Sequence, residues 1–187
     1  MPRLTSEHFV DRTTELLREQ CGGDVTMSMV LKACGAQKGS LYHFFPGGKE
    51  ELLVAAIKKM RRYSIEHIQK CIGETDSAAQ AIKKHLQFLA KLFDRPSITH
   101  GMPYLALAAT VGENNESVRK ACEAAIKEIQ SLYAGQLVKD GFSSKEAKSK
   151  AEFSILAVEG AILQARLRGN SAPLKLVASN LIEVLTP

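Results

Sequence analysis

Apolar residues recur at spacings of three and four along almost the whole chain, which is the spacing of an amphipathic helix. The residues that break helices cluster at only a few places, so the segments between them are expected to be continuous. No stretch shows the alternation of β-branched and polar residues that indicates a strand. The pattern therefore predicts an all-α fold. The expected helices cover residues 5–20, a short pair within 26–45, and 48–72, 76–93, 103–111, 114–139, 144–168 and 173–185.

Cap residues sharpen several of these boundaries. Thr5 or Ser6, Thr26 and Asp76 can each accept a bond from a free N–H at the start of a helix. Ser143 with Glu146 three residues later forms the pattern of a capping box.

The stretch from residue 26 to residue 53 predicts two short helices around a tight turn, followed by the start of a long helix. Gly35 can adopt the positive φ that ends the first short helix. Leu41 and Phe45 lie four apart and can pack the second short helix against the first. Polar side chains remain on the other face of this second helix: Gln37, Lys38, Ser40 and His43. Polar groups on a short, braced helix are what the recognition of base edges in a major groove requires.

Composition adds only broad limits. The 187 residues carry a net charge of +5, which permits a polyanionic partner without demanding one. Four cysteines are scattered without a CxxC pair, so we expect free buried thiols and a reducing compartment. With no run long enough to span a membrane and no secretory signal pattern, we expect a cytoplasmic protein that does not bind membranes.

No catalytic motif is present, and we expect neither an enzyme nor a cofactor. The sequence has no GxSxG motif, no glycine-rich phosphate loop and no evident catalytic triad. His67 and Cys71 are four apart and can present two ligands to one metal ion, but no third ligand is evident. We therefore expect no metal site.

The centre of the predicted helix 144–168, FSILAVEGAILQA, is apolar on nearly all sides and must be buried on all sides. Burial against a second copy of the chain explains this pattern, through residues of about 150–167 and 173–185. Gly160 and Ala161 allow close approach of two helices. The expected interface consists of Phe153, Leu156, Gly160, Ala161, Leu163, Leu167 and Leu176. The alternative is a core helix of a monomer.

Several motifs resemble the TetR family of transcriptional regulators. The run KGSLYHFF is followed within a few residues by KEELL, and Thr26 and the pair Cys34–Gly35 also match. The longer motif YHFFPGGKEEL, together with GMPYLALA and EGAILQARLRG, is similar to the LmrA/YxaF-like branch. The resemblance implies a three-helix DNA-binding domain with a helix-turn-helix at residues 1–48. It also implies a helical effector-binding and dimerisation domain at 49–187, joined through a linking helix at about 48–72.

The resemblance also implies roles for individual residues. Thr26, Tyr42 and Lys49 would hold the DNA backbone, while Gln37, Lys38, Ser40 and His43 would face the bases of a near-palindromic, double-stranded operator. A small apolar or aromatic effector would bind in the C-terminal domain and release the protein from DNA, which is the family's usual direction. Candidate lining residues are His67, Cys71, Phe88, Met102, Tyr104, Phe153 and Gln164. Phe44 would touch a thymine methyl group or pack inside the fold.

Two other hypotheses remain open at this stage. One is an all-helical ligand carrier or enzyme in which the helix-turn-helix is only structural. The other is a helical adaptor that binds proteins.

Overall fold

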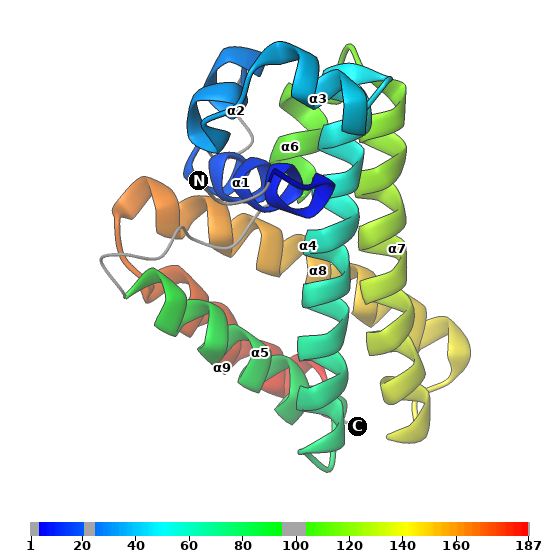
Figure 1. The fold of residues 1–187 in the computed structure, drawn as a ribbon. Coiled ribbons are helices and arrows are strands. Elements are labelled where there is room, and N and C mark those ends of the chain that lie inside the picture. Colours follow the sequence, from blue (N-terminus) through cyan, green and yellow to red (C-terminus); the bar gives the residue numbers. More distant parts are fainter. Residues whose placement is uncertain (1–3, 21–24, 95–103, 187) are drawn as a thin grey trace. The chain divides into compact units, whose positions relative to one another are not determined.

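The computed structural model describes residues 4–20, 25–94 and 104–186. This part of the chain is helical, without strands, as the periodicity predicts (Figure 1). The helices are α1 (Ser6–Glu19), α2 (Met27–Cys34), α3 (Lys38–Phe44), α4 (Gly48–Gly73), α5 (Ala78–Phe93), α6 (Tyr104–Thr110), α7 (Glu116–Lys139), α8 (Ser144–Arg168) and α9 (Ala172–Val184).

The helices form two compact units. The N-terminal unit comprises Met1–Arg62 and Met102–Ala125, and the C-terminal unit comprises Tyr63–Gly101 and Ile126–Pro187. Helices α4 and α7 therefore each contribute one half to each unit. A boundary at residue 48, as the resemblance implies, separates the short helices from α4, but the compact N-terminal unit extends further along the chain.

The N-terminal unit is built around α1, whose N-cap is Thr5. The Thr5 hydroxyl oxygen accepts a bond from the His8 N–H at 3.1 Å. Phe9 and Leu17 are fully buried, and α1 packs against α2. On the other side of α1, the Lys59 ammonium on α4 pairs with the Asp11 carboxylate and lies 3.6 Å from that of Glu7. These contacts hold α1 between α2 and the first half of α4.

In the C-terminal unit, α9 packs against both α5 and α8. Apolar side chains of α5 and α9 are buried here, among them Ile82, Leu86, Leu174, Ala178 and Leu181. The end of α7 is tied to the start of α5, because the Asp140 carboxylate accepts a bond from the Ala78 N–H at 2.6 Å.

The helix ends confirm most of the predicted caps. Gly35 and Gly169 end α2 and α8 with φ of 60° and 64°, and Ser143 with Glu146 forms the capping box of α8. The prediction that Asp76 is the N-cap of α5 was wrong. The Ser77 hydroxyl accepts the Gln80 N–H, while the Gln80 side chain accepts the Asp76 N–H, so the helix begins one residue later. Pro103, expected at the start of α6, lies outside the described residues.

The structure of α8 corrects one residue of the expected dimer interface, Ala161. Its buried face carries Ala147, Ala151, Ile155, Val158, Ile162 and Ala165, while the opposite side is exposed. Ala161 is on the buried face, 4% exposed, because α8 turns this side toward its own unit. Ala161 is therefore not available to a second chain in this structure. Cys34, Cys71 and Cys122 are free and buried, in line with the expected thiols, and Cys21 is outside the described residues.

Candidate nucleic-acid interface

Helices α2 and α3 form the helix-turn-helix that the sequence predicts. The Thr26 hydroxyl oxygen caps α2 by accepting the Met29 N–H at 3.2 Å. Gly35 closes the helix in the left-handed conformation, and the Ala36 N–H donates to the Leu31 carbonyl at 3.0 Å. Helix α3 then begins at Lys38. Because Thr26 uses an oxygen lone pair for the cap, its hydroxyl hydrogen remains a donor for an outside group.

Aromatic packing fixes the inner side of α3. Leu41 is fully buried and Phe45 nearly so. The Phe9 ring of α1 lies 5.9 Å from the Phe44 ring and 6.2 Å from the Phe45 ring, measured between centroids. Phe44 thus contacts the fold's own core, which favours the packing alternative of its two expected roles.

The outer side of α3 is polar, as predicted. Gln37, Lys38, Tyr42 and His43 are exposed, and Ser40 is half-buried. The Lys38 ammonium lies 5.8 Å from the centre of the Tyr42 ring, within the range of a cation–π contact. The structure therefore brings the side chains expected to face bases onto one accessible surface together with Tyr42, which is expected to bind the DNA backbone. We call this surface the recognition face: Gln37, Lys38, Ser40, Tyr42 and His43.

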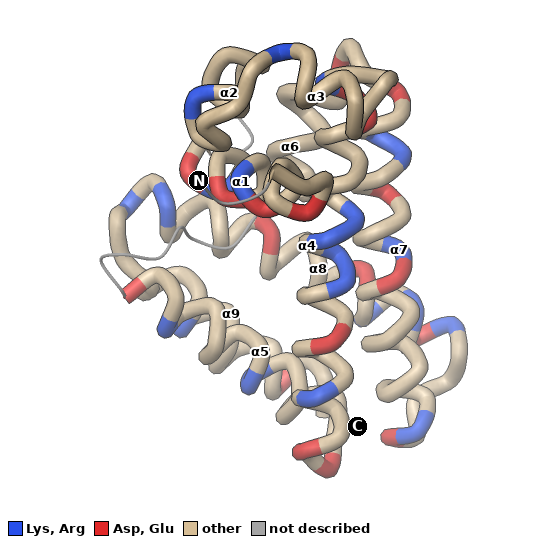
Figure 2. The backbone as a smooth tube through the Cα atoms, in the orientation of Figure 1, with Lys and Arg blue, Asp and Glu red and all other residues tan. Residues whose placement is uncertain are grey.

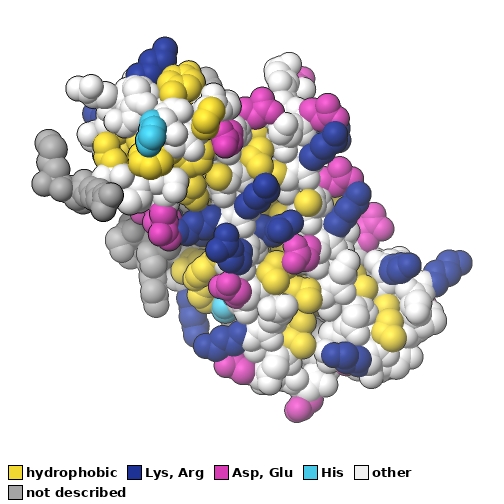
Figure 3. Space-filling model, turned by 45° about the vertical axis from the view of Figure 1, so that its right-hand side comes forward, with side chains coloured by type: hydrophobic (Ala, Val, Ile, Leu, Met, Phe, Trp, Pro, Cys, Tyr) yellow, Lys and Arg dark blue, Asp and Glu magenta, His cyan; other side chains and the backbone are white. Residues whose placement is uncertain are grey.

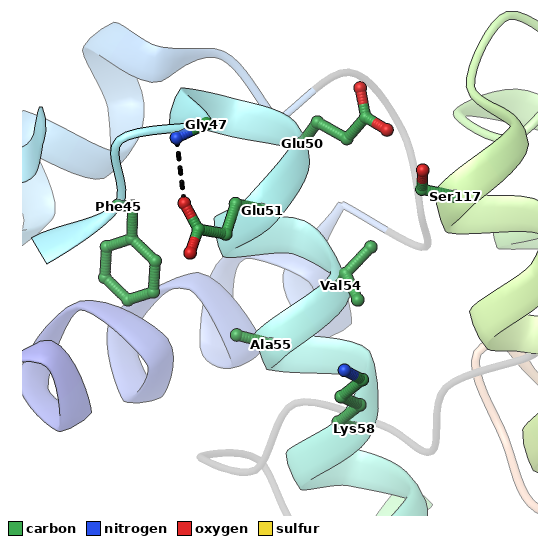
Figure 4. Close-up of a pocket in the computed structure, with 8 residues that line it drawn as sticks. All are labelled: Phe45, Gly47, Glu50, Glu51, Val54, Ala55, Lys58 and Ser117. Carbon is green, nitrogen blue, oxygen red and sulfur yellow. Dashed lines mark hydrogen bonds between the residues drawn. The ribbon is translucent and has the colours of Figure 1, made fainter.

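The linker after α3 holds the Tyr42 ring in place. Gly48 begins α4 with a φ of 67°, and a Cβ built there would lie 3.2 Å from a Tyr42 ring carbon. The absence of a side chain at Gly48 thus leaves room for the Tyr42 ring. The Gly47 N–H donates to the Glu51 carboxylate at 2.8 Å, which anchors the linker to the first turn of α4 (Figure 4). Lys49, predicted to bind the DNA backbone, is half-buried in the same turn.

A shallow groove lies beside this linker. It encloses about 550 Å³ between the linker, the first turns of α4 and Ser117 of α7 (Figure 4). Both Glu50 and Glu51 line it, with Lys58 further along α4. Two carboxylates at its upper end make this groove a poor place for a phosphate group.

Sequence reasoning missed two residues of this region. The Arg12 guanidinium on α1 donates to the Ala33 carbonyl at 3.2 Å and braces the end of α2, a contact that no local pattern shows. Lys32 is exposed on α2 and lines a hollow of about 600 Å³ together with Lys38. Its position between the apolar residues of this helix is a signal that it faces solvent, but only the fold shows that it lies near Lys38.

Basic residues are also concentrated in one stretch of α4. Lys58, Lys59, Arg61 and Arg62 follow one another within five positions (Figure 2). Figure 3 shows a group of lysine and arginine side chains near the middle of the face drawn, with acidic side chains close by. Because Lys59 pairs with Asp11 and Glu7, part of this charge is used to hold α1.

The C-terminal unit contains a cluster of polar and aromatic side chains, the His–Tyr cluster: His67, Cys71, His85, Phe88 and Tyr133. His67 stacks on Phe88 with 3.8 Å between ring centroids, and its Nε2 lies 3.5 Å from the Cys71 sulfur. His85 Nδ1 and the Tyr133 hydroxyl form a buried hydrogen bond of 2.6 Å. Three residues expected to line an effector pocket therefore do meet, and sequence reasoning missed the buried pair beside them.

Burial sets the charge state of this cluster. Desolvation lowers the pKa of His85 to about 3, with a smaller contribution from His67, so the ring is neutral at physiological pH. Burial also lowers the pKa of His67 and raises that of Cys71, which keeps the imidazole and the thiol uncharged. Among the described residues, no three histidine, cysteine, aspartate or glutamate side chains gather closely enough to hold a metal ion.

The remaining residues predicted to line the pocket do not join the cluster. Phe153 and Gln164 are exposed on α8, and Tyr104 is buried in the N-terminal unit. Met102 lies outside the described residues.

An apolar stripe is exposed along α8, and α9 also exposes a large apolar side chain. On α8, Phe153, Leu156, Gly160, Leu163 and Leu167 are exposed at alternating spacings of three and four. Leu176 on α9 is exposed as well, and the exposed fraction reaches 86% at Leu167. Large apolar side chains gathered on one surface mark an interaction site.

Comparison with known proteins now identifies the family. The model of bacterial regulatory proteins of the tetR family matches residues 9–56, and the model of the LmrA/YxaF-like transcriptional regulator C-terminal domain matches residues 78–180. The chain is 32% identical over 179 residues to the HTH-type transcriptional regulator LmrA of Bacillus subtilis strain 168, covering 96% of this chain and 95% of that protein. This chain belongs to the TetR family of transcriptional regulators. The resemblance seen in the sequence is thereby confirmed, including its LmrA/YxaF-like branch.

Other comparisons agree with this assignment. The chain is also 31% identical over 156 residues to the HTH-type transcriptional regulator YxaF of Bacillus subtilis strain 168, covering 83% of this chain and 81% of that protein. Its fold matches the crystal structure of Escherichia coli NemR in the reduced form with a TM-score of 0.82, at 21% identity and 94% coverage of both chains. A TetR transcriptional regulator from Legionella pneumophila matches with a TM-score of 0.84, at 21% identity and 98% and 99% coverage.

Within the described residues of this TetR-family regulator, no helix has both the length and the apolar character that a membrane crossing requires.

Proposed function

We propose that this regulator is a homodimeric repressor that a small apolar or aromatic effector releases from a near-palindromic operator. The observation that carries the proposal is the recognition face, where exposed polar side chains project from a helix whose other side is locked by Leu41, Phe45 and Phe9. A rigid helix with free polar groups suits base recognition, because the side chains keep a fixed register relative to the scaffold.

The proposed division of roles follows the position of each side chain. Gln37, Lys38, Ser40 and His43 contact base edges. Thr26, Tyr42 and Lys49 bind phosphate oxygens: Thr26 through its remaining hydroxyl donor, Tyr42 through a phenol held beside Gly48, and Lys49 through its charge. Lys32, exposed beside Lys38, is added to this second group.

Dimerisation is proposed through the apolar stripe on α8 and α9. A homodimer with twofold symmetry buries the same patch on both chains. Phe153, Leu156, Leu163, Leu167 and Leu176 supply apolar side chains for such a contact, and Gly160 lies among them with no described atom within 4 Å of its Cβ position. Two recognition faces held in this way address two half-sites about one helical turn apart, or slightly more.

Effector binding is proposed at the His–Tyr cluster. A neutral imidazole, a phenol, a thiol and stacked rings favour an uncharged, aromatic ligand, since a buried charge would lack a partner there. Helix α4 carries His67 and Cys71 in its second half and begins at Gly48, beside Tyr42. A ligand that binds one conformation of α4 better than another changes DNA affinity by that difference in binding free energy.

The test begins with selection of duplexes from fragmented genomic DNA by the purified protein. Affinity for the most enriched duplex is then measured across a salt series. Tyr42→Phe and Lys49→Ala should weaken binding to all sequences, and each lost phosphate contact should reduce the salt slope by about 1. Lys38→Ala should change the preferred sequence. Lys148→Ala, which removes an exposed charge from α8, is the matched control and should leave affinity unchanged.

If the first three variants all bind like the wild type, the proposed DNA-binding function is wrong. The effector is tested by repeating the selection with lipophilic aromatic compounds, and the proposal requires that at least one of them reduces the enrichment.

A further inference from the structure

Gly39 is a glycine for which the described structure gives no internal reason. It is the second residue of α3, on the exposed side of the helix. A Cβ built on it meets no described atom within 4 Å. Its φ is not positive, unlike those of Gly35, Gly48 and Gly169, which need the left-handed conformation. An alanine would therefore fit both the space and the backbone at this position.

Glycine has a cost in a helix. It loses more backbone freedom on folding than alanine, and a helix of only seven residues, such as α3, has few bonds to offset that loss. Where a residue of this kind lies on a candidate binding surface, it points to a requirement outside the chain.

The neighbours of Gly39 show where this requirement lies. Tyr42 and His43 are three and four positions further along and share its side of the helix. Lys38 precedes it, with its ammonium directed toward the Tyr42 ring. Gly39 is therefore a low point in the recognition face, bordered by three long polar side chains.

We propose that Gly39 is the point of closest approach between α3 and the DNA duplex. The missing Cβ allows the duplex to reach the helix backbone while Lys38, Tyr42 and His43 extend around the contact. A methyl group there would stand between the two surfaces and push the longer side chains out of reach of their partners. This inference rests on the proposed DNA-binding function and names a specificity-determining position within it.

The test compares Gly39→Ala and Gly39→Leu with Gly135→Ala. Gly135 is also an exposed glycine inside a helix, with no described atom within 4 Å of its Cβ position, but it lies on α7 in the C-terminal unit. Two quantities are measured for each variant: the thermal midpoint, and the affinity for the duplex that the wild type enriches most strongly from a library of random duplexes.

The expected result separates stability from binding. Both alanine variants should keep the wild-type midpoint or raise it by about 1–3 °C. Gly39→Ala should weaken DNA binding about tenfold or more, Gly39→Leu should weaken it further, and Gly135→Ala should stay within about twofold of the wild type.

The inference is overturned if Gly39→Ala binds as tightly as the wild type. It is also overturned if Gly39→Ala lowers the midpoint, since the glycine would then serve the fold, or if Gly135→Ala loses as much affinity. A wild-type protein that enriches no duplex is a different result, because it overturns the proposed DNA-binding function itself.

Discussion

Replacing His85 should reduce the acid sensitivity of this protein's stability. His85 is buried and hydrogen-bonded to Tyr133, and its pKa falls from the ordinary 6.5 to about 3 in the folded state. In the unfolded chain the ring regains its ordinary pKa. Between these two pKa values the unfolded state binds a proton at His85 and the folded state does not, so the free energy of unfolding falls as the pH is lowered through this range.

The magnitude follows from the two pKa values. Above pH 6.5 both states are mostly neutral at His85 and no free energy is lost. Integrated from about pH 7.5 down to about pH 5, the extra proton binding of His85 in the unfolded state lowers the free energy of unfolding by about 2 kcal/mol. For a chain of this length that corresponds to a fall in the thermal midpoint of about 4–8 °C.

The assay is thermal unfolding of the wild type and of His85→Phe/Tyr133→Phe at both pH values. The double variant removes both partners of the buried bond and keeps ring-shaped side chains, so it should fold. Protein concentration is held constant, because dissociation of a dimer would shift the midpoint. Every other titrating group is common to both proteins, including His67, whose own pKa is lowered by burial. A double variant that loses as much stability in acid as the wild type would refute the reasoning.

Three further predictions concern stability and assembly. Tyr133→Phe alone leaves His85 Nδ1 without its buried partner and should cost about 1–3 kcal/mol in urea unfolding, whereas His85→Phe/Tyr133→Phe should recover much of that loss. Equal losses in the two proteins would show that an unpaired Nδ1 has no cost in this core. Leu156→Glu should convert the proposed dimer to a monomer in analytical sedimentation, while Glu152→Gln, on the exposed side of the same helix, should not. If the protein stays dimeric with Leu156→Glu, the dimer does not form through the apolar stripe of α8. Ser143→Ala removes the oxygen that accepts the Glu146 N–H and should lower the free energy of unfolding by about 1 kcal/mol in the same urea assay. Ser149→Ala, on the exposed side of α8, is the control, and equal stability of the two variants would mean that the capping box is not stabilising.

Most helix boundaries could be predicted from sequence signals that act within a few residues. Thr26 and Gly35 are where α2 starts and ends because the hydroxyl cap and the positive φ are decided within a few residues of chain. The same locality explains the one wrong cap. Asp76 and Ser77 are both good N-cap residues, and the choice between them depends on the Gln80 side chain and on Asp140, 62 residues away from Ala78. Sequence patterns hold no information on that second contact.

The candidate sites divide in the same way. The recognition face could be predicted because it lies on one short helix, where spacing alone separates Leu41 from Gln37 and His43. The His–Tyr cluster could be found only in part, since His85 Nδ1 meets the Tyr133 hydroxyl across 48 positions. Nothing in the spacing of the sequence pairs these two residues. Ala161 was placed in the expected dimer interface for a related reason, because an apolar sequence cannot show which face of α8 is covered by its own unit.

The two proposed sites also differ in their electrostatics, and this separates their responses. The proposed DNA binding by the N-terminal unit depends on exposed cations and should weaken steeply with salt. The proposed effector binding at the His–Tyr cluster involves groups that burial keeps neutral, because burial lowers the pKa of both histidines and raises that of the Cys71 thiol, so it should depend little on salt or on pH between about 7 and 8. A ligand whose releasing effect disappears at high salt, at matched DNA occupancy, would therefore be acting at the DNA surface and not at the cluster.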